Sequence, residues 1–457
     1  MTPLTAVFLL ICVTIGAYLN SLGGEFVYDD YDLIVRNTAL RSWGNLSSAF
    51  GKSLLGYYRP FIENLFTLER QAFGLHAPSW HAVNVSLHLF VSLLVFALVR
   101  MISRGQLMLA TLTAVLFALH PAHVESVAWV SGVSDVLMSQ FFISSLIFYL
   151  RHQETGQNKW LAGSVVFYAA ALLSKETALA LPLLVFFFAG LRGPQTPPRR
   201  LIPLLLPYLA VTGVYFSVRL SVLGQLSALV PENTDVTNAQ VMMTIPAVLA
   251  HYASILFFPF HLSVNYGTSF VESVTDWKFV AGVVLLLALV IGGLFFAAAL
   301  KDSLWLAGMA LLLVPLSPAL FLRAFLPEIL VQDRYLYLPL AGFSLLVALA
   351  LVRLAGRSGS WMPRLAFVFA TILILAFGAG TVAQNRVWRN TFMLQGRALA
   401  YAPQSVKAHR SLAAAFLRAG DVQAARRHMV EATNRPRPDP QDLISLAGMQ
   451  MVVGDLT

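Results

Sequence analysis

Apolar runs of membrane-crossing length recur along almost the whole chain. They are the sequence feature that most constrains its fold. The hydrocarbon core of a bilayer is about 30 Å thick, and an α-helix needs about 20 apolar residues to cross it. Only 12% of the 457 residues are charged, about half the share that is usual in soluble domains. The sequence therefore predicts an all-α, polytopic membrane protein. The runs lie at residues 3–21, 80–101, 107–120, 134–150, 160–174, 177–191, 201–221, 279–300, 303–322, 335–353 and 363–384, with a weaker one at 241–260.

Basic residues between the runs set the predicted orientation. Cytoplasmic loops are enriched in Lys and Arg, and a cytoplasmic N-terminus places the first three basic clusters inside. All four clusters stay inside only if the proline-containing run at 241–260 lies flat or re-enters. We therefore expect about eleven transmembrane helices, a long first external loop at residues 22–79 and an external C-terminal tail. The clusters are Arg100 and Arg104; Arg151 and Lys159; Arg192, Arg199 and Arg200; and Arg353, Arg357 and Arg364.

Charge distribution and cysteine content exclude several classes of protein. The net charge is +9, but the basic residues are scattered between apolar runs, whereas nucleic-acid binding needs them concentrated on one stripe. Cys12 is the only cysteine, which excludes an intramolecular disulfide and a cysteine-based zinc site. The first run has no basic leader and no small-residue cleavage signal, so we expect a retained span. The Leu, Ala and Arg usage suggests a bacterial inner membrane, with the tail in the periplasm.

Composition changes after residue 387, and the remaining region, 388–457, repeats itself. Five residue identities recur at a spacing of 34 in this Ala- and Arg-rich segment, including Leu412 with Leu446 and Gly420 with Gly454. That spacing is the period of tetratricopeptide helix pairs. We expect a membrane domain at 1–387 and a tetratricopeptide-like helical stub of about one and a half repeats. A plain helical hairpin with chance self-similarity is the alternative.

Three carboxylates cluster just past the first apolar run. Asp29 and Asp30 are neighbours, and Asp32 follows two positions later. Carboxylates repel one another and are costly near an apolar phase unless a partner or a reaction needs them. The cluster therefore predicts chemistry at one membrane face, on a substrate that is linked to lipid. The alternative is that the two adjacent aspartates only end the first helix at the headgroup layer.

Further polar residues fall in the predicted external loops and would meet the acidic cluster on the same face. Such convergence from separate loops is what an active site at a membrane interface requires. They are Tyr58 and Arg59 in the first loop; His120, His123 and Glu125 in the second; Lys175 and Glu176 in the third; and Arg334, Tyr335 and Tyr337 in a later one.

Taken in order, these residues form a set of motifs that covers most of the chain. The set is Tyr28-Asp29-Asp30, Tyr58-Arg59-Pro60, His120-Pro-x-His123-Val-Glu125-x-Val-Ala-Trp129, Leu-Ser-Lys175-Glu176 and Arg334-Tyr335-Leu-Tyr337, followed by the repeat tail. It resembles the transmembrane-and-tetratricopeptide O-mannosyltransferase family and, more broadly, the GT-C fold of glycosyltransferases. The resemblance implies transfer of a sugar from a polyprenyl-phosphate donor to an acceptor on the external side, by a single inverting displacement. The chain departs from the family pattern at Val133, where many relatives have arginine, and in its short tail.

The types of residue suit this chemistry. A hydroxyl acceptor loses a proton as it attacks the anomeric carbon, so a carboxylate base is needed. We expect Asp29 to be the base and Asp30 to orient the acceptor or the loop, and the opposite assignment stays open. The leaving phosphate needs cations, which Arg334 and Lys175 would supply, with Arg59 as a third candidate. Snorkelling to the headgroups, or a pair between Lys175 and its neighbour Glu176, is the structural alternative.

The remaining candidates are assigned to the substrate rather than to a metal. Glu125 and the two loop histidines are expected to line the acceptor or the sugar, and the tyrosines to contact sugar or lipid. The spacing His-x-x-His-x-Glu also invites a metal site, but a proline interrupts the segment and no cysteine helps. We therefore predict no metal site and no firmly implied cofactor, and leave a divalent cation open. The substrate set is His120, His123, Glu125, Tyr58, Tyr335 and Tyr337.

The function expected from these observations is transfer of a mannose-like hexose from a polyprenyl-phosphate donor to a hydroxyl, of protein Ser or Thr, on the external face. The repeat tail favours a polypeptide partner. A lipid-linked glycan ligase or polymerase is one alternative, although it would want a large basic loop late in the chain. A membrane transporter is another, although its ionisable residues would lie in mid-span. A membrane-tethered scaffold would leave the polar loops unexplained.

Overall fold

The computed structural model describes residues 2–191, 198–225, 236–300, 302–356, 361–434 and 440–453, and in these ranges the chain is helical without a β-strand. The predicted all-α polytopic architecture is confirmed. The α-helices are α1 (Pro3–Tyr18), α2 (Asn45–Ser48), α3 (Pro60–Phe73), α4 (Ala77–Ile102), α5 (Leu107–Leu119), α6 (Val124–Val127), α7 (Val133–Thr155), α8 (Asn158–Ser174), α9 (Leu181–Leu191), α10 (Pro198–Leu223), α11 (Asn238–Phe257), α12 (Trp277–Leu300), α13 (Ser303–Leu316), α14 (Pro339–Ala355), α15 (Met362–Val387), α16 (Thr391–Tyr401), α17 (Val406–Arg418), α18 (Val422–Thr433) and α19 (Pro440–Val453).

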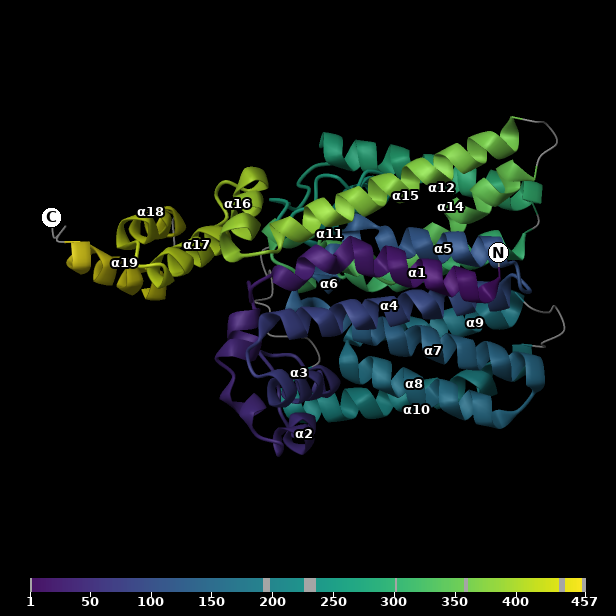
Figure 1. The fold of residues 1–457 in the computed structure, drawn as a ribbon, viewed down its shortest axis with the longest axis horizontal. Helices are drawn as coiled ribbons and strands as arrows, with labels where there is room; N and C mark the ends of the chain where they lie inside the picture. The colour runs from purple at the N-terminus through teal and green to yellow at the C-terminus, as the bar shows by residue number, and fades with distance from the viewer. Residues whose placement is uncertain are drawn as a thin grey trace.

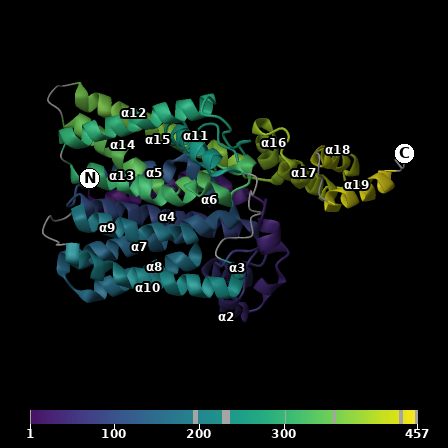
Figure 2. The ribbon, with the colours of Figure 1, turned by 180° about the vertical axis from the view of Figure 1, so that it is seen from behind.

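The long apolar helices lie side by side in one bundle (Figure 1). The N-terminus is at one end of this bundle, while the loop that carries α2 and α3 lies at the other end (Figures 1 and 2). Helices α16 to α19 project from that second end, which we call the tail-facing end. The loop after α1 carries Asp29, Asp30 and Asp32, and we call it the acidic loop. It therefore shares one end of the molecule with the tail.

Every predicted apolar run coincides with a described helix, but the number of spans stays a prediction. By length and composition, seven helices of the described chain could cross a membrane, or eight if α5 and the bent segment after it form one span. Three shorter apolar helices lie at Glu176–Leu191, Trp277–Gly293 and Pro339–Ala355. The basic residues Arg192 and Arg357 and the side chains of Arg199 and Arg200 lie outside what the structure describes.

Helix α11 is one of the seven, although the basic residues predicted that it does not cross. It packs against α12, where Gly282 meets the backbone of Pro246, and it also contacts loops of the tail-facing end. Asn238, in its first turn, accepts a hydrogen bond from Arg323 at 2.8 Å. Near its other end, the hydroxyl of Tyr252 accepts from the backbone N–H of Gln332 at 3.4 Å. Its length permits a crossing, so the expectation that it lies flat or re-enters stays a prediction.

A sharp bend after α5 brings the His120 to Trp129 segment into the interior. Leu107–Leu119 and Pro121–Val127 are bent relative to each other by 54°, and the break falls at Pro121, which has no N–H to continue a helix. Side chains from other helices bond the carbonyls that the bend releases. His88 of α4 bonds the carbonyl of Ala118 at 3.1 Å, and Thr381 of α15 donates to the carbonyl of Leu119 at 2.7 Å.

The tail forms antiparallel helix pairs around a small core of its own, made of Ala413, Ala425, Met429, Ala432 and Met449. Gly420, at the turn between α17 and α18, has a φ of +83°, which glycine adopts without a steric penalty. Its predicted repeat partner Gly454 lies outside the described residues, as does part of the second repeat. The tetratricopeptide assignment and the boundary at residue 387, where α15 ends, remain predictions.

Close packing of α13 and α14 generates a stability prediction. A Cβ at Gly342 would overlap the backbones of Gly308 and Leu312, because small residues let these helices approach closely. We expect Gly342→Ala to destabilise the fold by roughly 1–3 kcal/mol, measured as thermal unfolding in detergent. Gly292→Ala is the control, since nothing lies within 4 Å of that position. Equal melting temperatures for the two variants would contradict the packing argument.

Candidate active site

The acidic loop is held in a fixed turn by the buried side chain of Asp30. One carboxylate oxygen of Asp30 accepts from the N–H of Val27 at 2.9 Å, and the other accepts from the N–H of Ser131 at 2.8 Å and from its hydroxyl. Tyr28, between these residues, has a φ of +57°, a conformation that costs an L-residue about 1–2 kcal/mol. The structure thus gives Asp30 the contacts of a residue that orients the loop.

Burial raises the pKa of Asp30 to about 7, against the hydrogen bonds from Ser131 and Val27 that favour the ionised form. The side chain is completely buried, so the cost of an unscreened negative charge outweighs the three donors. The hydroxyl of Ser131 can donate to the ionised carboxylate or accept from the protonated one. Asp30 therefore changes its charge near neutral pH.

Asp29 is the accessible carboxylate of the neighbouring pair. Its side chain is 41% exposed, and Oδ1 lies 3.6 Å from Nζ of Lys407, which comes from α17 of the tail. Within the described chain it is thus open to solvent on one side and faces a cation on the other. This is the placement that a base for an incoming hydroxyl requires.

Arg334 is paired with Glu125, so the predicted phosphate ligand and a predicted substrate ligand contact each other directly. Nη1 of Arg334 donates to Glu125 at 2.6 Å, and its backbone N–H donates to the other carboxylate oxygen at 3.1 Å. The guanidinium carbon lies 5.5 Å from the ring centre of Trp129 and 6.0 Å from that of Tyr335. The side chain of Arg334 is still 22% exposed.

Lys175 is paired with Asp135 rather than with its neighbour Glu176. Nζ lies 2.6 and 2.7 Å from the two oxygens of Asp135, and both side chains are buried. Burial lowers the pKa of Lys175, and the adjacent Asp135 opposes that change. The ammonium also lies 4.9 Å from the ring centre of Tyr335. Tyr335 therefore lies between the two predicted phosphate ligands.

Arg59 completes this row of charges. Its guanidinium makes two hydrogen bonds to Glu176, at 2.6 and 3.1 Å. Arg219 of α10 approaches the same carboxylate to 3.9 Å. Tyr58 is buried, and its hydroxyl donates to the carbonyl of Phe50 at 3.3 Å. Arg59 is thus close to the predicted cations, whereas the structure places Tyr58 in the packing beneath them.

His120, His123 and Tyr337 are buried in the core and are separate from the accessible carboxylate. Nε2 of His120 bonds the carbonyl of Leu256 at 3.1 Å, and the hydroxyl of Tyr337 bonds His88 at 2.7 Å. The His123 ring packs 4.5 Å from the Tyr337 ring. These contacts are those of packing and of backbone capping. No described group of three His, Cys, Asp or Glu residues could hold a metal ion.

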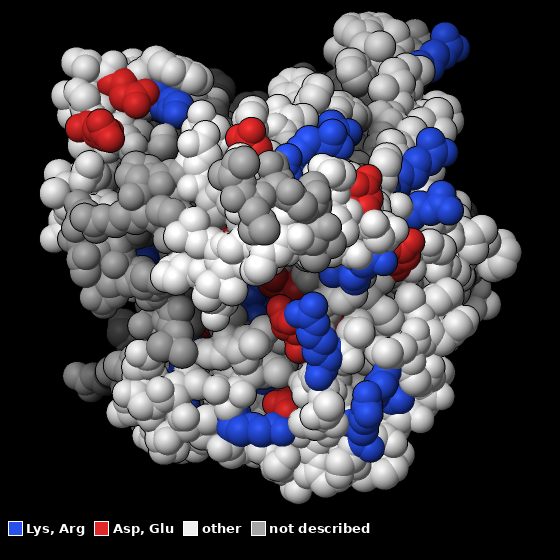
Figure 3. Space-filling model, turned by 90° about the vertical axis from the view of Figure 1, so that its left-hand side faces the viewer, with Lys and Arg blue, Asp and Glu red and all other residues white. Residues whose placement is uncertain are grey.

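The structure therefore gathers the acidic loop and three predicted cations at the tail-facing end. Figure 3 looks at this end and shows acidic and basic side chains next to one another around a hollow. Sequence reasoning missed Lys407, which lies in a separate predicted domain, and Arg219. A signal for Arg219 was present, because an arginine inside an apolar run is costly without a partner.

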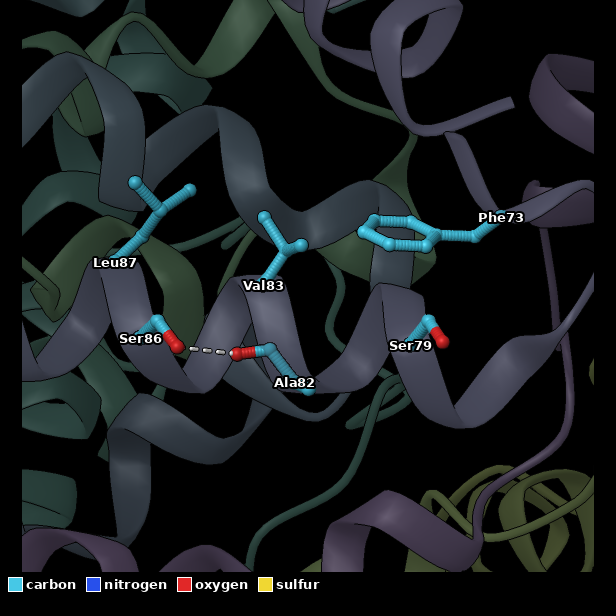
Figure 4. Close-up of a pocket in the computed structure, with 6 residues that line it drawn as sticks. All are labelled: Phe73, Ser79, Ala82, Val83, Ser86 and Leu87. Atoms are coloured by element: carbon cyan, nitrogen blue, oxygen red, sulfur yellow. Dashed lines mark hydrogen bonds between the residues drawn. The ribbon is translucent and has the colours of Figure 1, made fainter. Parts of the chain in front are cut away.

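A further surface hollow of the described chain is formed by other residues. It has a volume of about 370 Å³ and is lined by Phe73, Ser79, Ala82, Val83, Ser86 and Leu87, from the end of α3 and the first half of α4 (Figure 4). The hydroxyl of Ser86 donates to the carbonyl of Ala82, so little polar capacity remains. None of the predicted site residues lines it.

The buried pair of Lys175 and Asp135 generates a prediction about stability. Removing one partner leaves an uncompensated buried charge, which typically costs 3–5 kcal/mol. We expect about that loss for Lys175→Met and for Asp135→Leu, and a clearly smaller loss for the double variant than the sum of the two.

The measurement is the free energy of unfolding of each variant in detergent. Arg151→Met is the control, because it removes an exposed ion pair with Glu154 that is worth at most about 1 kcal/mol. Additive losses in the double variant would show that the two side chains do not act as a pair.

Asp30 generates a pH prediction. Between its ordinary pKa of 3.8 and its raised value of about 7, the folded state retains a proton that the unfolded state has lost. The contribution of Asp30 to the free energy of unfolding therefore falls as the pH rises through this window, by at most about 1.4 kcal/mol per unit. Above pH 7 it changes no further.

Asp30→Asn should remove this dependence, so the difference in melting temperature between wild type and variant should change from pH 4 to 7 and then level off. Asp32→Asn is the control, because Asp32 is exposed and pairs only with Arg36 among the described contacts. A difference that is constant with pH would contradict the raised pKa.

Comparison with known proteins identifies relatives, although no protein-family model matches the chain. A protein O-mannosyl-transferase of Caenorhabditis elegans, F38B6.6, is 26% identical over 426 residues, which is 88% of this chain and 59% of the relative. The protein O-mannosyl-transferase TMTC4 of mouse is 27% identical over 93% of this chain and 66% of its own length. Human TMTC2 is 34% identical over 206 residues, or 40% of this chain and 24% of its own.

The chain spans roughly three fifths to two thirds of the length of the first two relatives. Among solved structures, ArnT from Cupriavidus metallidurans, bound to undecaprenyl phosphate, aligns with 99% of this chain and 78% of its own at 18% identity and a TM-score of 0.45. The sequence similarities confirm what the ordered motifs indicated: over most of its length, this multi-pass membrane protein resembles the transmembrane-and-tetratricopeptide (TMTC) protein O-mannosyl-transferases.

Proposed function

We propose that the chain is a membrane glycosyltransferase that moves a mannose-like hexose from a polyprenyl-phosphate donor to a Ser or Thr hydroxyl of a polypeptide. The observation that carries the proposal is the half-exposed carboxylate of Asp29, in the same end of the bundle as the cations Arg334, Lys175 and Arg59. A base and a phosphate site at one membrane face are the two elements that the reaction needs.

Asp29 takes the role of general base. As the acceptor oxygen bonds to the anomeric carbon, its proton passes to the Asp29 carboxylate, and a positioned base of this kind accelerates a reaction by roughly 10²–10⁴. Asp30 acts on the loop, because its two oxygens are already occupied by Val27 and Ser131. The geometry thus supports the expected division of labour between the two neighbours.

The cations take the role of stabilising the leaving group. The bond from the anomeric carbon to the phosphate oxygen breaks as the new bond forms on the opposite face, so the electron pair stays on the phosphate and the configuration inverts. Arg334 offers the partly exposed fork, and Lys175 and Arg59 add positive charge behind it. The paired carboxylates fix the direction of each cation before the donor arrives.

The relatives support the finer identity of the substrates. They carry the name protein O-mannosyl-transferase, which favours mannose as the sugar and a polypeptide as the acceptor. The orientation that the basic clusters predict would place the reaction on the external face, and a bacterial inner membrane would make that face periplasmic. We propose no metal or other cofactor, and a divalent cation remains open.

The test is transfer of a radiolabelled sugar by the full chain in lipid nanodiscs. A panel of polyprenyl-phosphate sugars serves as donors, and a membrane extract with Ser- and Thr-containing peptides serves as acceptors. We expect mannose to transfer and Asp29→Asn to lower the rate on the order of 100-fold or more. Asp30→Asn should also lower it, through the loop.

Asp32→Asn is the matched control and should retain wild-type activity. Full activity of Asp29→Asn would show that Asp29 is not the general base, and Glu125 would then be the next candidate. Transfer only of whole lipid-linked glycans would favour a ligase or polymerase. Absence of transfer from every donor by a well-folded wild type would reject the glycosyltransferase and favour a transporter.

A further inference from the structure

The first helices of the tail are fastened to the acidic loop. The backbone N–H of Glu25 donates to the carbonyl of Arg389, just before α16, at 2.8 Å. The ring of Trp388 stacks on that of Trp129, with centres 5.8 Å apart and planes inclined by 21°. Neither contact follows from the division into a membrane domain and a separate tail.

Lys407, near the start of α17, reaches the two residues that precede the buried Asp30. Its Nζ lies 3.6 Å from Oδ1 of Asp29 and 3.9 Å from the ring centre of Tyr28. The Tyr28 ring also meets the ring of Trp129 edge to face, at 5.5 Å. Tyr28, whose backbone is in the left-handed region, is therefore held by a cation of the tail and an indole of the bundle.

A second cation of α17 contacts the same loop. The guanidinium carbon of Arg418 lies 4.3 Å from the ring centre of Tyr31. Lys407 and Arg418 are eleven residues apart, which is about three turns of an α-helix, so both project from one face. Two cations of α17 thus contact the acidic loop, one just before and one just after the adjacent aspartates.

The start of α17 is anchored on the bundle independently of these contacts. Ser405, the N-cap of α17, accepts a hydrogen bond from Asn265 at 2.9 Å, and Asn265 also donates to Glu328 at 3.2 Å. Lys407 follows the cap by two residues. The backbone that carries Lys407 is therefore fixed, and its ammonium faces the loop, although the side chain itself is 43% exposed.

We propose that Lys407 is a positioning residue for Asp29, and that α17 is part of the catalytic unit. The ammonium contacts both the carboxylate of Asp29 and the ring of Tyr28 and fixes their positions relative to each other, so that the base faces the incoming hydroxyl. When Asp29 takes up the proton of the acceptor, the ion pair loses its Coulomb attraction, while Tyr28 and Arg418 keep the loop in place. The role of Asp29 rests on the proposed function, whereas the docking of α17 does not.

The kinetic test uses the full chain in nanodiscs. We expect Lys407→Met to lower kcat on the order of tenfold or more, because a displaced catalytic group loses efficiency steeply, with the KM for the donor within about twofold of wild type. Lys407→Arg should restore most of kcat, since it retains the charge. Arg427→Met removes an exposed cation of α18 from the same tail and should match wild type.

A structural test separates this inference from the proposed function. Hydrogen exchange of the backbone amides of residues 25–36 should be faster in Lys407→Met than in wild type or in Arg427→Met, whether or not the wild type transfers sugar. Unchanged exchange would overturn the inference that Lys407 holds the loop. Unchanged kcat in Lys407→Met, or a loss that Lys407→Arg does not restore, would overturn the positioning role. If the wild type is inactive while exchange changes as expected, the docking stands and the proposed function fails.

Discussion

Charge compensation near the hydrocarbon is the constraint on which the tail-facing end depends. An ion buried without a partner costs several kcal/mol, and this end contains Glu125 with Arg334, Asp135 with Lys175, and Glu176 with Arg59. Each pair joins elements that are distant in the chain. The pairs therefore neutralise the charges and, in doing so, fix the loops relative to one another.

This end of the molecule also gives the two neighbouring aspartates, Asp29 and Asp30, different tasks. Asp30 is buried and acts as a joint between the acidic loop and the turn at Ser131, whereas Asp29 is left accessible beside it. Adjacent residues in a turn point in different directions, so one can be satisfied internally while the other stays available. The left-handed conformation of Tyr28 turns the chain just before both residues.

The length of the apolar runs made the helices predictable, because every run coincides with a helix, even where length alone does not establish a crossing. The site was predictable in part. Paired residues such as Arg334 and Glu125 stood out as costly polar groups at span ends, but their pairing depends on tertiary contacts that spacing does not encode. His120 looked like a ligand from its neighbours, and only the bend at Pro121 shows that it caps the carbonyl of Leu256. Lys407 was hidden because a composition boundary separated it from the loop that it touches.

The bend after α5 has a consequence for the rigidity of the tail-facing end. Its released carbonyls are bonded by His88 and Thr381, and Asn84 donates to the carbonyls of Val127, Trp129 and Val130. Displacing the segment from His120 to Trp129 would expose backbone oxygens where water is scarce. The contacts of Lys407 with Tyr28 and of Arg418 with Tyr31 lie at the exposed surface, where water competes with them. The segment at the bend is therefore more rigid than the exposed edge of the acidic loop.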